Sequence, residues 1–482
     1  MNSEKRSFIS EDWLSLWIGL FVFMLSLGLF INLDILGWGI KTNVWTDIFK
    51  STSTVSKAYE GIPGIISILL TYVFLLIIVG IGLKALNVDF KKFFIPFTII
   101  FFISYFCWLL GHYAYIAATS NSLDKFGISW SLNLTGEAGY IIALFAGLII
   151  GNFFPKLVDK IKEATRPELF IKTAIVILGA GLGVKAAESF GLASTIMFQG
   201  LSAIIVAYLI YWALVYLIAR KYFKFSKEWA APLASGISIC GVSAAIATGS
   251  AIRSRPIIPI MVSSLVVVFA VFELILLPLL AQIFLWSEPM VAAAWMGLAV
   301  KTDGAAVASG AITEALIRAK ALASTGAAYK EGWIVMTTTT VKVFIDMFIG
   351  IWAFVLAVIW CSKIEKKEKV EKVKAREIWD RFPKFIIGYV LTFIIFLLIC
   401  LAYPNAIGNA NSASSQSNTF RVMFFVFTFF TIGVVSNFKK LREEGIGKLA
   451  VVYVLCLFGF IIWVGLLISW IFFHGIKPPL VQ

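Results

Sequence analysis

The chain has 482 residues, 60% of them hydrophobic and 14% charged, with a formal net charge of +14. Soluble domains carry about 25% charged residues, so the composition excludes a soluble globular protein and predicts an all-α polytopic membrane protein. Lysines and arginines lie in short segments between apolar runs, as in the cytoplasmic loops of membrane proteins. This distribution argues against a nucleic-acid partner.

Enzymatic chemistry has few candidate residues in this chain. There are two histidines and five cysteines, and the cysteines lack the spacing of a metal site or of a disulfide framework. No phosphate-binding loop of the Walker type occurs. We therefore expect no enzyme activity, no catalytic residue, no metal and no cofactor, with Na⁺ as the one candidate for a bound ion.

Apolar runs long enough to cross a bilayer occur throughout the chain. They lie at 13–32, 63–86, 93–117, 139–152, 171–184, 197–219, 257–285, 333–361, 384–402, 420–437 and 448–473. We expect an added N-terminal bundle of three helices at 1–125. A first transporter part at 139–361, a cytoplasmic linker at 362–383 and a second transporter part at 384–473 then follow.

The distribution of basic residues predicts the orientation of the chain in the membrane. The segment 363–384 carries nine basic residues, whereas the segment 404–418 carries none and is expected to be an outer loop. Basic loops face the cytoplasm, which places the N-terminus inside and the C-terminus outside a bacterial-type plasma (inner) membrane. Membrane lipid is then a constant partner, and a homodimer is left open.

Two glycine-rich segments inside apolar regions resemble each other. The first motif copy (236–249) and the second motif copy (297–310) align without a gap and share five identical residues, two terminal glycines and three alanines. Such segments at membrane depth line a cavity or pack closely, and a duplicated pair is typical of a transporter with inverted repeats. Either two interrupted helices or two re-entrant hairpins fit, and hairpins keep the basic pair Arg253 and Arg255 inside.

A weaker repeat supports the duplication. Residues 179–191 align with 433–445 at a constant offset of 254, and the predicted spans run in opposite directions. Opposite directions are what an inverted repeat requires.

Several of these segments resemble one membrane protein family. The strings at 144–152 (LFAGLIIGN), 178–182 (LGAGL), 238–245 (SICGVSAA) and 434–441 are similar to the sulfate exporter family of YeiH-type membrane proteins, over about residues 139–473. That family is grouped with sodium/proton antiporters and bile-acid symporters, so the resemblance implies inverted repeats, interrupted helices and secondary transport. Where relatives typically have a His-Glu pair, this chain has Lys301-Thr302-Asp303.

Charged residues within apolar segments are the first candidates for a transport site. A charge at the centre of a membrane helix costs at least about 2.5–3.5 kcal/mol, so Lys301 and Asp303 are expected to have a function or to pair with each other. Lys342 and Asp346 are four apart on one helix face, and they form either a structural ion pair or part of the same site. Glu273 is a lone acid in the 257–285 run.

The candidate site combines these charges with small polar residues of both motif copies. Substrate-binding candidates are Ser238, Cys240, Gly241, Ser243, Lys301, Thr302, Ser309 and Lys342, and candidates for the coupling ion or proton are Asp303, Asp346 and Glu273. The leading hypothesis is a secondary-active transporter of a small anion, of the sulfate, sulfonate or carboxylate class, coupled to H⁺ or Na⁺. A cation/proton antiporter and a non-transporting membrane scaffold or receptor are the alternatives.

Overall fold

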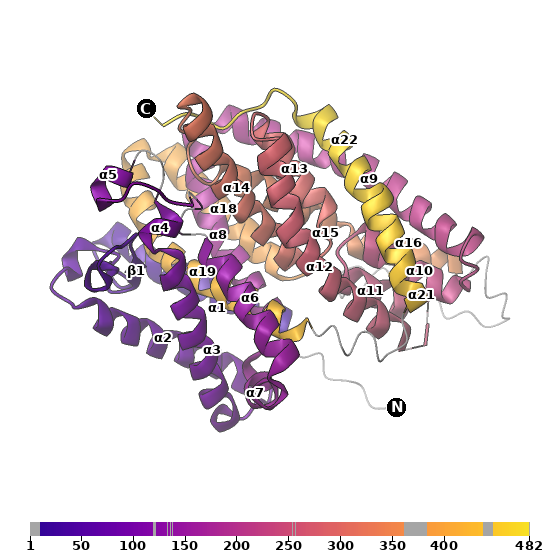
Figure 1. Cartoon of the computed structure of the whole chain (residues 1–482), viewed down its shortest axis with the longest axis horizontal. Coiled ribbons are helices and arrows are strands. Elements are labelled where there is room, and N and C mark those ends of the chain that lie inside the picture. The colour runs from indigo at the N-terminus through magenta and orange to yellow at the C-terminus, as the bar shows by residue number, and fades with distance from the viewer. Residues whose placement is uncertain are drawn as a thin grey trace. The chain divides into compact units, whose positions relative to one another are not determined.

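The described part of the protein is mainly helical (Figure 1). The computed structural model describes residues 10–118, 122–132, 134, 136, 138–252, 254–255, 257–360, 383–436 and 447–481. Within these residues, ten helices are long and apolar enough to cross a membrane, and the bent pair α6 and α7 brings the number to as many as 11. The prediction of an all-α polytopic membrane protein is confirmed.

The chain divides into two compact units, each built from two separate segments. Unit 1 comprises Met1–Phe190 and Lys384–Val435, and unit 2 comprises Gly191–Pro383 and Ser436–Gln482. The predicted linker 362–383 and the second half of the weaker repeat, 433–445, fall mostly outside the described residues.

Unit 1 contains most of the predicted N-terminal spans. Its elements are α1 (Glu11–Ser26), η1 (Leu27–Ile31), β1 (Ile40–Thr42), η2 (Ile48–Lys50), β2 (Thr52–Thr54), η3 (Lys57–Tyr59), α2 (Gly64–Ala85), α3 (Phe90–Gly111), α4 (Ala114–Ala117), α5 (Leu123–Phe126), α6 (Ala138–Phe153), α7 (Pro155–Ile161), η4 (Lys162–Ala164), α8 (Pro167–Glu188), α18 (Phe385–Ala402), η6 (Pro404–Ala406) and α19 (Ile407–Val435). Strands β1 and β2 form an antiparallel hairpin in which Lys41 pairs with Ser53.

Close helix contacts through glycine hold unit 1 together. Helix α19 packs on α6 and α8, and α8 packs on α18 and α1. A Cβ on Gly147 would lie 2.1 Å from the Phe430 carbonyl oxygen, and one on Gly433 would lie 2.4 Å from the Leu144 carbonyl oxygen. Small residues let membrane helices approach to backbone contact, so the glycines of the 144–152 string are explained by the α6–α19 interface.

Helix α19 corrects one prediction. The segment 404–418 was expected to be an outer loop, but the helix begins at Ile407 and continues to Val435. Its polar residues find partners within the protein: the Gln416 amide donates to the Asp34 carboxylate at 2.8 Å, and the Ser417 hydroxyl donates to the Ser414 carbonyl at 3.0 Å. A hydropathy profile of the sequence contains no information about hydrogen-bond partners. The polar first half of α19 was therefore predicted to be a loop.

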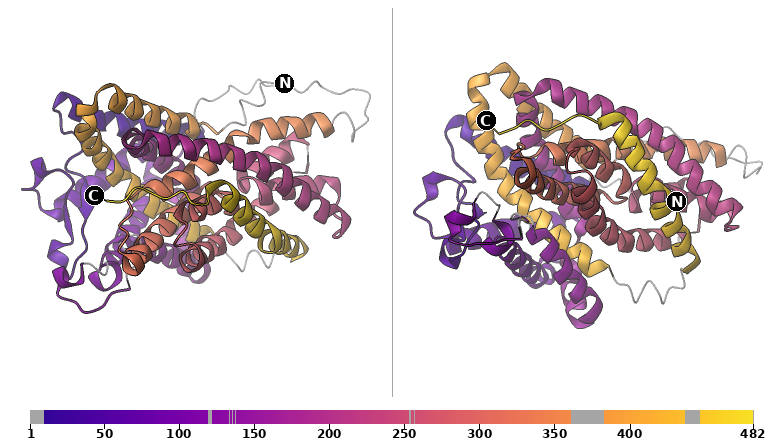
Figure 2. Two further views of the ribbon diagram at one scale, coloured as in Figure 1. Left: turned by 90° about the horizontal axis from the view of Figure 1, so that it is seen from above. Right: turned by 45° about the horizontal axis from the view of Figure 1, so that its top comes forward.

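Unit 2 contains both motif copies. Its elements are α9 (Phe190–Lys221), α10 (Lys227–Ser238), α11 (Val242–Ala251), α12 (Ile257–Phe284), α13 (Pro289–Ala299), α14 (Asp303–Thr325), α15 (Trp333–Met347), α16 (Ile349–Ile359), α21 (Gly447–Cys456), η7 (Leu457–Ile461) and α22 (Ile462–Phe473). Helix α9 is a single uninterrupted helix in both views of Figure 2. Helices α12 and α15 both pack on α14.

Candidate functional site

The first motif copy forms the tip of a helical hairpin. Helix α10 ends at Ser238, and the chain turns back into α11 through Gly241, whose φ is +63°. Halfway down, the Thr248 hydroxyl donates to the Ser235 hydroxyl oxygen at 2.7 Å. At the open end, the Arg255 backbone N–H donates to the Glu228 carboxylate at 2.7 Å. These partners are equidistant from the tip, so α10 and α11 are antiparallel neighbours and not two halves of one crossing helix.

The second motif copy forms a matching tip between α13 and α14. Helix α13 ends at Ala299, and Thr302 caps α14 by accepting a hydrogen bond from the Ala305 N–H at 3.2 Å. Thr338 of α15 contacts both halves. Its hydroxyl donates to the Ala293 carbonyl at 2.8 Å, and a Cβ on Gly310 would lie 2.8 Å from the Thr338 side chain. The two contacts fall at similar distances from the tip, as in a hairpin.

The two tips touch each other through backbone. A Cβ on Gly241 would lie 2.8 Å from the Lys301 carbonyl oxygen and 2.5 Å from a methyl group of Val266. Both the positive φ and this close approach require glycine at position 241. The two motif copies, which are 61 residues apart in sequence, therefore meet at a single place in unit 2.

A buried lysine on α15 links the two tips. The Lys342 ammonium donates to the Ile239 carbonyl of the first tip at 3.1 Å and lies 3.6 Å from the Asp303 carboxylate of the second tip. The exposed fraction is 1% for the Lys342 side chain and 4% for that of Asp303. A buried charge is stable only when it is paired and hydrogen-bonded, and Lys342 meets both conditions through the two hairpins.

Three potential cation ligands gather beside this ion pair. The Cys240 sulfur and carboxylate oxygens of Asp303 and Asp346 lie within 4.8 Å of one another, and all three residues are buried. One ion could contact all three atoms, since ligand distances of about 2.0–2.6 Å span that separation. The geometry therefore offers a place for a cation, with Lys342 as an internal positive charge next to it.

Lys301 belongs to a neighbouring part of the same cluster. Its ammonium donates to the Leu298 carbonyl and lies 4.7 Å from the centroid of the Tyr211 ring. Its backbone N–H donates to the Glu273 carboxylate at 2.8 Å, and Glu273 also accepts from the Tyr453 hydroxyl at 3.2 Å. Among the described ion pairs, Asp303 is matched with Lys342 and not with Lys301, so the alternative of a local Lys301–Asp303 pair is not the arrangement found.

Most of the predicted site residues lie at or beside the two tips. Ser238, Cys240, Gly241, Lys301, Thr302, Asp303, Lys342, Asp346 and Glu273 are all buried in unit 2. Ser309 is different, because its hydroxyl donates to the Ala306 carbonyl of its own helix at 2.8 Å. Ser243 lies on α11, but its side chain is outside the described part of the structure.

Sequence reasoning did not identify the two tyrosines of the cluster. Tyr211 lies on α9 and Tyr453 on α21, and each is at most 1% exposed. In the sequence they stand among apolar residues with no motif around them. These two tyrosines differ from other tyrosines because they are fully buried next to Lys301 and Glu273. That proximity depends on the tertiary structure and cannot be read from the sequence.

The charge balance of the cluster is negative when every group is ionised. Three carboxylates, Glu273, Asp303 and Asp346, face two ammonium groups, Lys301 and Lys342, all of them buried. The sum of these formal charges is −1. A deficit of positive charge in a low-dielectric environment favours the uptake of a proton or a metal cation.

These features define a polytopic all-α membrane protein whose two helical hairpins meet at a buried cluster of charges. The family model described as "Conserved hypothetical protein 698" matches residues 110–453. The chain belongs to this family of membrane proteins, whose relatives carry the name UPF0324. The comparisons thus support a family of membrane proteins, whereas the expected assignment to a sulfate exporter family stays a prediction.

Several relatives support the assignment. UPF0324 membrane protein NE0724 of Nitrosomonas europaea is 42% identical over 474 residues, covering 98% of this chain and 97% of that protein. An uncharacterized protein of Archaeoglobus fulgidus is 48% identical over 168 residues, 30% of this chain and 88% of that protein. A UPF0324 membrane protein of Nitratidesulfovibrio vulgaris is 29% identical over 388 residues, 78% of this chain and 58% of that protein. No solved structure matches the chain.

Proposed function

We propose that the protein is a secondary-active transporter of a small anion, of the sulfate, sulfonate or carboxylate class, coupled to H⁺ or Na⁺. The observation that carries the proposal is the meeting of the two hairpin tips at the Lys342 ammonium. This ammonium lies between the Ile239 carbonyl, in the turn that leads into α11, and the Asp303 carboxylate at the N-terminus of α14. Helix N-termini present unpaired N–H groups and a positive dipole end, which bind anions. In known transporter folds, helix N-termini near the middle of the membrane point at the anionic groups of substrates.

The coupling ion is assigned to the acidic side of the cluster. Asp303 and Asp346, together with the Cys240 sulfur, would hold Na⁺ or a proton, and Glu273 is a second proton site. With the cluster at −1, an anion would be repelled until a cation is bound. This order of binding would couple the two movements, because the anion is not stable at the site until the cation has bound.

A transport assay with matched lysine variants tests the proposal. Purified protein in liposomes should take up labelled sulfate, a sulfonate or a dicarboxylate when a gradient of H⁺ or Na⁺ is imposed. Lys342→Ala should reduce the initial rate by about tenfold or more, since a charge-assisted hydrogen bond contributes about 1.5–3 kcal/mol. Lys320→Ala is the control, because Lys320 lies on α14 with an exposed side chain.

The same assay separates the alternatives. The charge balance of −1 specifically favours a cation/proton antiporter, in which Asp303 and Asp346 bind the transported ion. Exchange of Na⁺ for H⁺ without any anion, retained in Lys301→Ala, would support the antiporter and contradict the anion proposal. A protein that moves no ion, and that no anion or cation stabilises against heat, would instead be a scaffold or receptor.

A further inference from the structure

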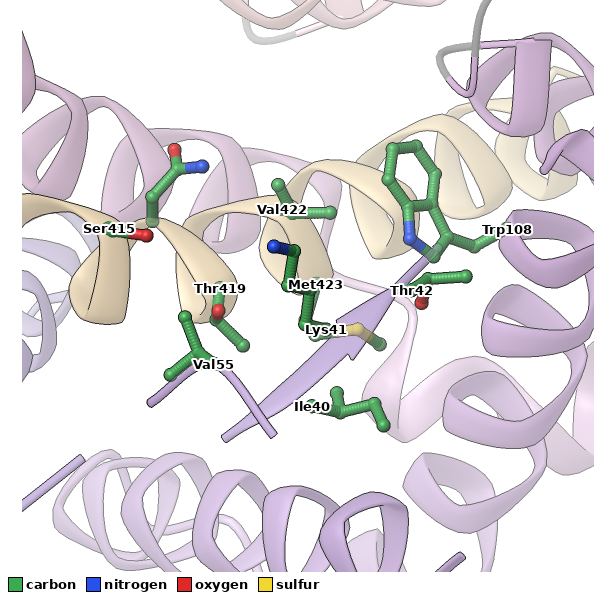
Figure 3. Close-up of a pocket in the computed structure, with 10 residues that line it drawn as sticks. Ile40, Lys41, Thr42, Val55, Trp108, Ser415, Thr419, Val422 and Met423 are labelled. Atoms are coloured by element: carbon green, nitrogen blue, oxygen red, sulfur yellow. The ribbon is translucent and has the colours of Figure 1, made fainter. Parts of the chain in front are cut away.

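Unit 1 contains a cavity of about 180 Å³ between the β1–β2 hairpin and α19 (Figure 3). Its polar lining is Lys41, Thr42, Ser415, Asn418 and Thr419, and Trp108 closes one side. One water molecule needs about 10–15 Å³ of such space. The cavity therefore has room for a small organic molecule and not only for one or two waters.

The polar side of the cavity is suited to an oxyanion. Figure 3 shows the Lys41 side chain extending from β1 toward α19. Among the described residues, no acidic side chain forms an ion pair with Lys41. Arg421 adds a second positive charge nearby, since its guanidinium donates to the Asn418 side-chain oxygen. Hydroxyl groups of Ser415 and Thr419 supply further donors to an anion in this position.

The composition of α19 singles out the same place. Several other polar residues in the first half of the helix have partners in the protein, as Gln416 has in Asp34 and Ser417 in Ser414. Ser415 and Thr419 line the cavity, as does Asn418, whose side-chain oxygen accepts from Arg421. Three polar side chains of α19 therefore meet at one cavity, and a few placed polar groups in an otherwise apolar pocket favour a ligand with a polar head.

The rest of the lining is apolar. Ile40, Val55, Val422 and Met423 surround the polar groups together with the ring of Trp108. A ligand that matches the whole cavity has one anionic head and a short hydrocarbon body, because apolar walls with a few placed polar groups fix both position and orientation.

We propose that this cavity, hereafter the Lys41 pocket, binds a small amphiphilic oxyanion such as a short-chain sulfonate or carboxylate. The Lys41 pocket is formed by unit 1 alone, whereas the cluster of charges lies in unit 2. The proposal therefore does not depend on the transport function.

Titration calorimetry of the full-length protein in a neutral detergent tests the Lys41 pocket. The probe is pentanesulfonate, and pentanol is the uncharged control of similar length. We expect saturable binding of pentanesulfonate that Lys41→Ala weakens by about tenfold or more, as for loss of a charge-assisted hydrogen bond. Lys41→Arg should retain most of the affinity. Lys50→Ala and Lys57→Ala, two exposed lysines of the same segment, should leave it unchanged.

Three results would overturn the proposal. The first is equal affinity in Lys41→Ala and wild type. The second is equal binding of pentanol and pentanesulfonate. The third is loss of pentanesulfonate binding when an anionic lipid is present. It is tested by repeating the titration in nanodiscs of phosphatidylcholine with and without phosphatidylglycerol. If phosphatidylglycerol blocks the Lys41-dependent binding, the occupant is a lipid headgroup and not a small soluble molecule.

Discussion

At the scale of single residues, Lys342 illustrates how a membrane protein retains a buried charge. Its ammonium is held by the Ile239 carbonyl and the Asp303 carboxylate, which belong to different hairpins. Removing one partner of a buried ion pair typically costs about 3–5 kcal/mol, because the other charge is left without compensation. Lys342 is therefore expected to keep the two tips together as well as to attract an anion.

Gly241 provides a residue-scale prediction. Gly241→Ala should lower the melting temperature through two costs, a left-handed backbone penalty of about 1–2 kcal/mol and a clash with the Lys301 carbonyl. Gly326→Ala is the matched control, since Gly326 also has a positive φ (+72°) but has nothing within 4 Å of its Cβ position. Scanning fluorimetry of both variants should show the larger decrease for Gly241→Ala. Equal decreases would mean that the tips do not touch.

The sequence identified the charged residues of the site but not their partners. Lys301, Asp303 and Lys342 were recognisable because charges inside apolar segments are rare. Their pairing was not predictable, since Asp303 contacts a lysine 39 positions away and not the lysine two positions away. Tertiary packing decides such choices, and spacing along a helix indicates only which pairs can reach each other.

At the scale of elements, a surface contact between Arg255 and Glu228 stabilises the open end of the α10–α11 hairpin. The Arg255 backbone N–H donates to the Glu228 carboxylate, and the Arg255 guanidinium lies 3.2 Å from the same group. The backbone hydrogen bond is the main reason why the pKa of Glu228 is lowered from its usual value, with the guanidinium adding to the effect. Glu228 lies outside the candidate membrane spans.

This contact predicts a pH dependence of hairpin stability. A carboxyl group with a lowered folded-state pKa contributes stability that is fully present above its unfolded pKa, about 4.3, and lost as the pH falls through the folded pKa. Wild type should therefore melt at a higher temperature than Glu228→Gln at pH 7, and the difference should shrink as the pH falls below about 4. Glu60→Gln, which changes an exposed glutamate, is the control. A difference that is independent of pH would contradict the assignment.

Helices made of apolar residues were predicted with nearly correct bounds. A helix whose polar residues are stabilised by side-chain partners was not. The run at 63–86 corresponds to α2 (Gly64–Ala85), and the run at 257–285 corresponds to α12 (Ile257–Phe284). Helix α19 was placed 13 residues too late because its first half is polar. The glycines of the first motif copy predicted a break in the helix. They did not decide whether α11 continues across the membrane or turns back antiparallel to α10, and both arrangements were left open.

At the scale of the whole molecule, the number of crossings predicts where the chain ends lie. Up to 11 spans are present in the described residues if α6 with α7 counts as one, and an odd number places the termini on opposite sides. Together with the basic 363–384 segment, this predicts a cytoplasmic N-terminus and an external C-terminus. A C-terminal alkaline phosphatase fusion should be active in bacteria and a C-terminal green fluorescent protein fusion dark. The reverse pattern would contradict the orientation.

The hairpin form of the two motif copies has a consequence for any such labelling experiment. Two hairpins and two crossing helices both leave the C-terminus on the same side, because replacing two hairpins by two crossings changes the count by an even number. The two arrangements differ only in the short connections between the copies. With hairpins, Ser254 stays with the cytoplasmic loops and Ser287 faces outward; with crossing helices, both positions exchange sides. Tags at the chain ends therefore cannot distinguish hairpins from crossing helices. Tags at Ser254 and Ser287, on either side of α12 (Ile257–Phe284), distinguish them by the side of the membrane on which each tag is accessible.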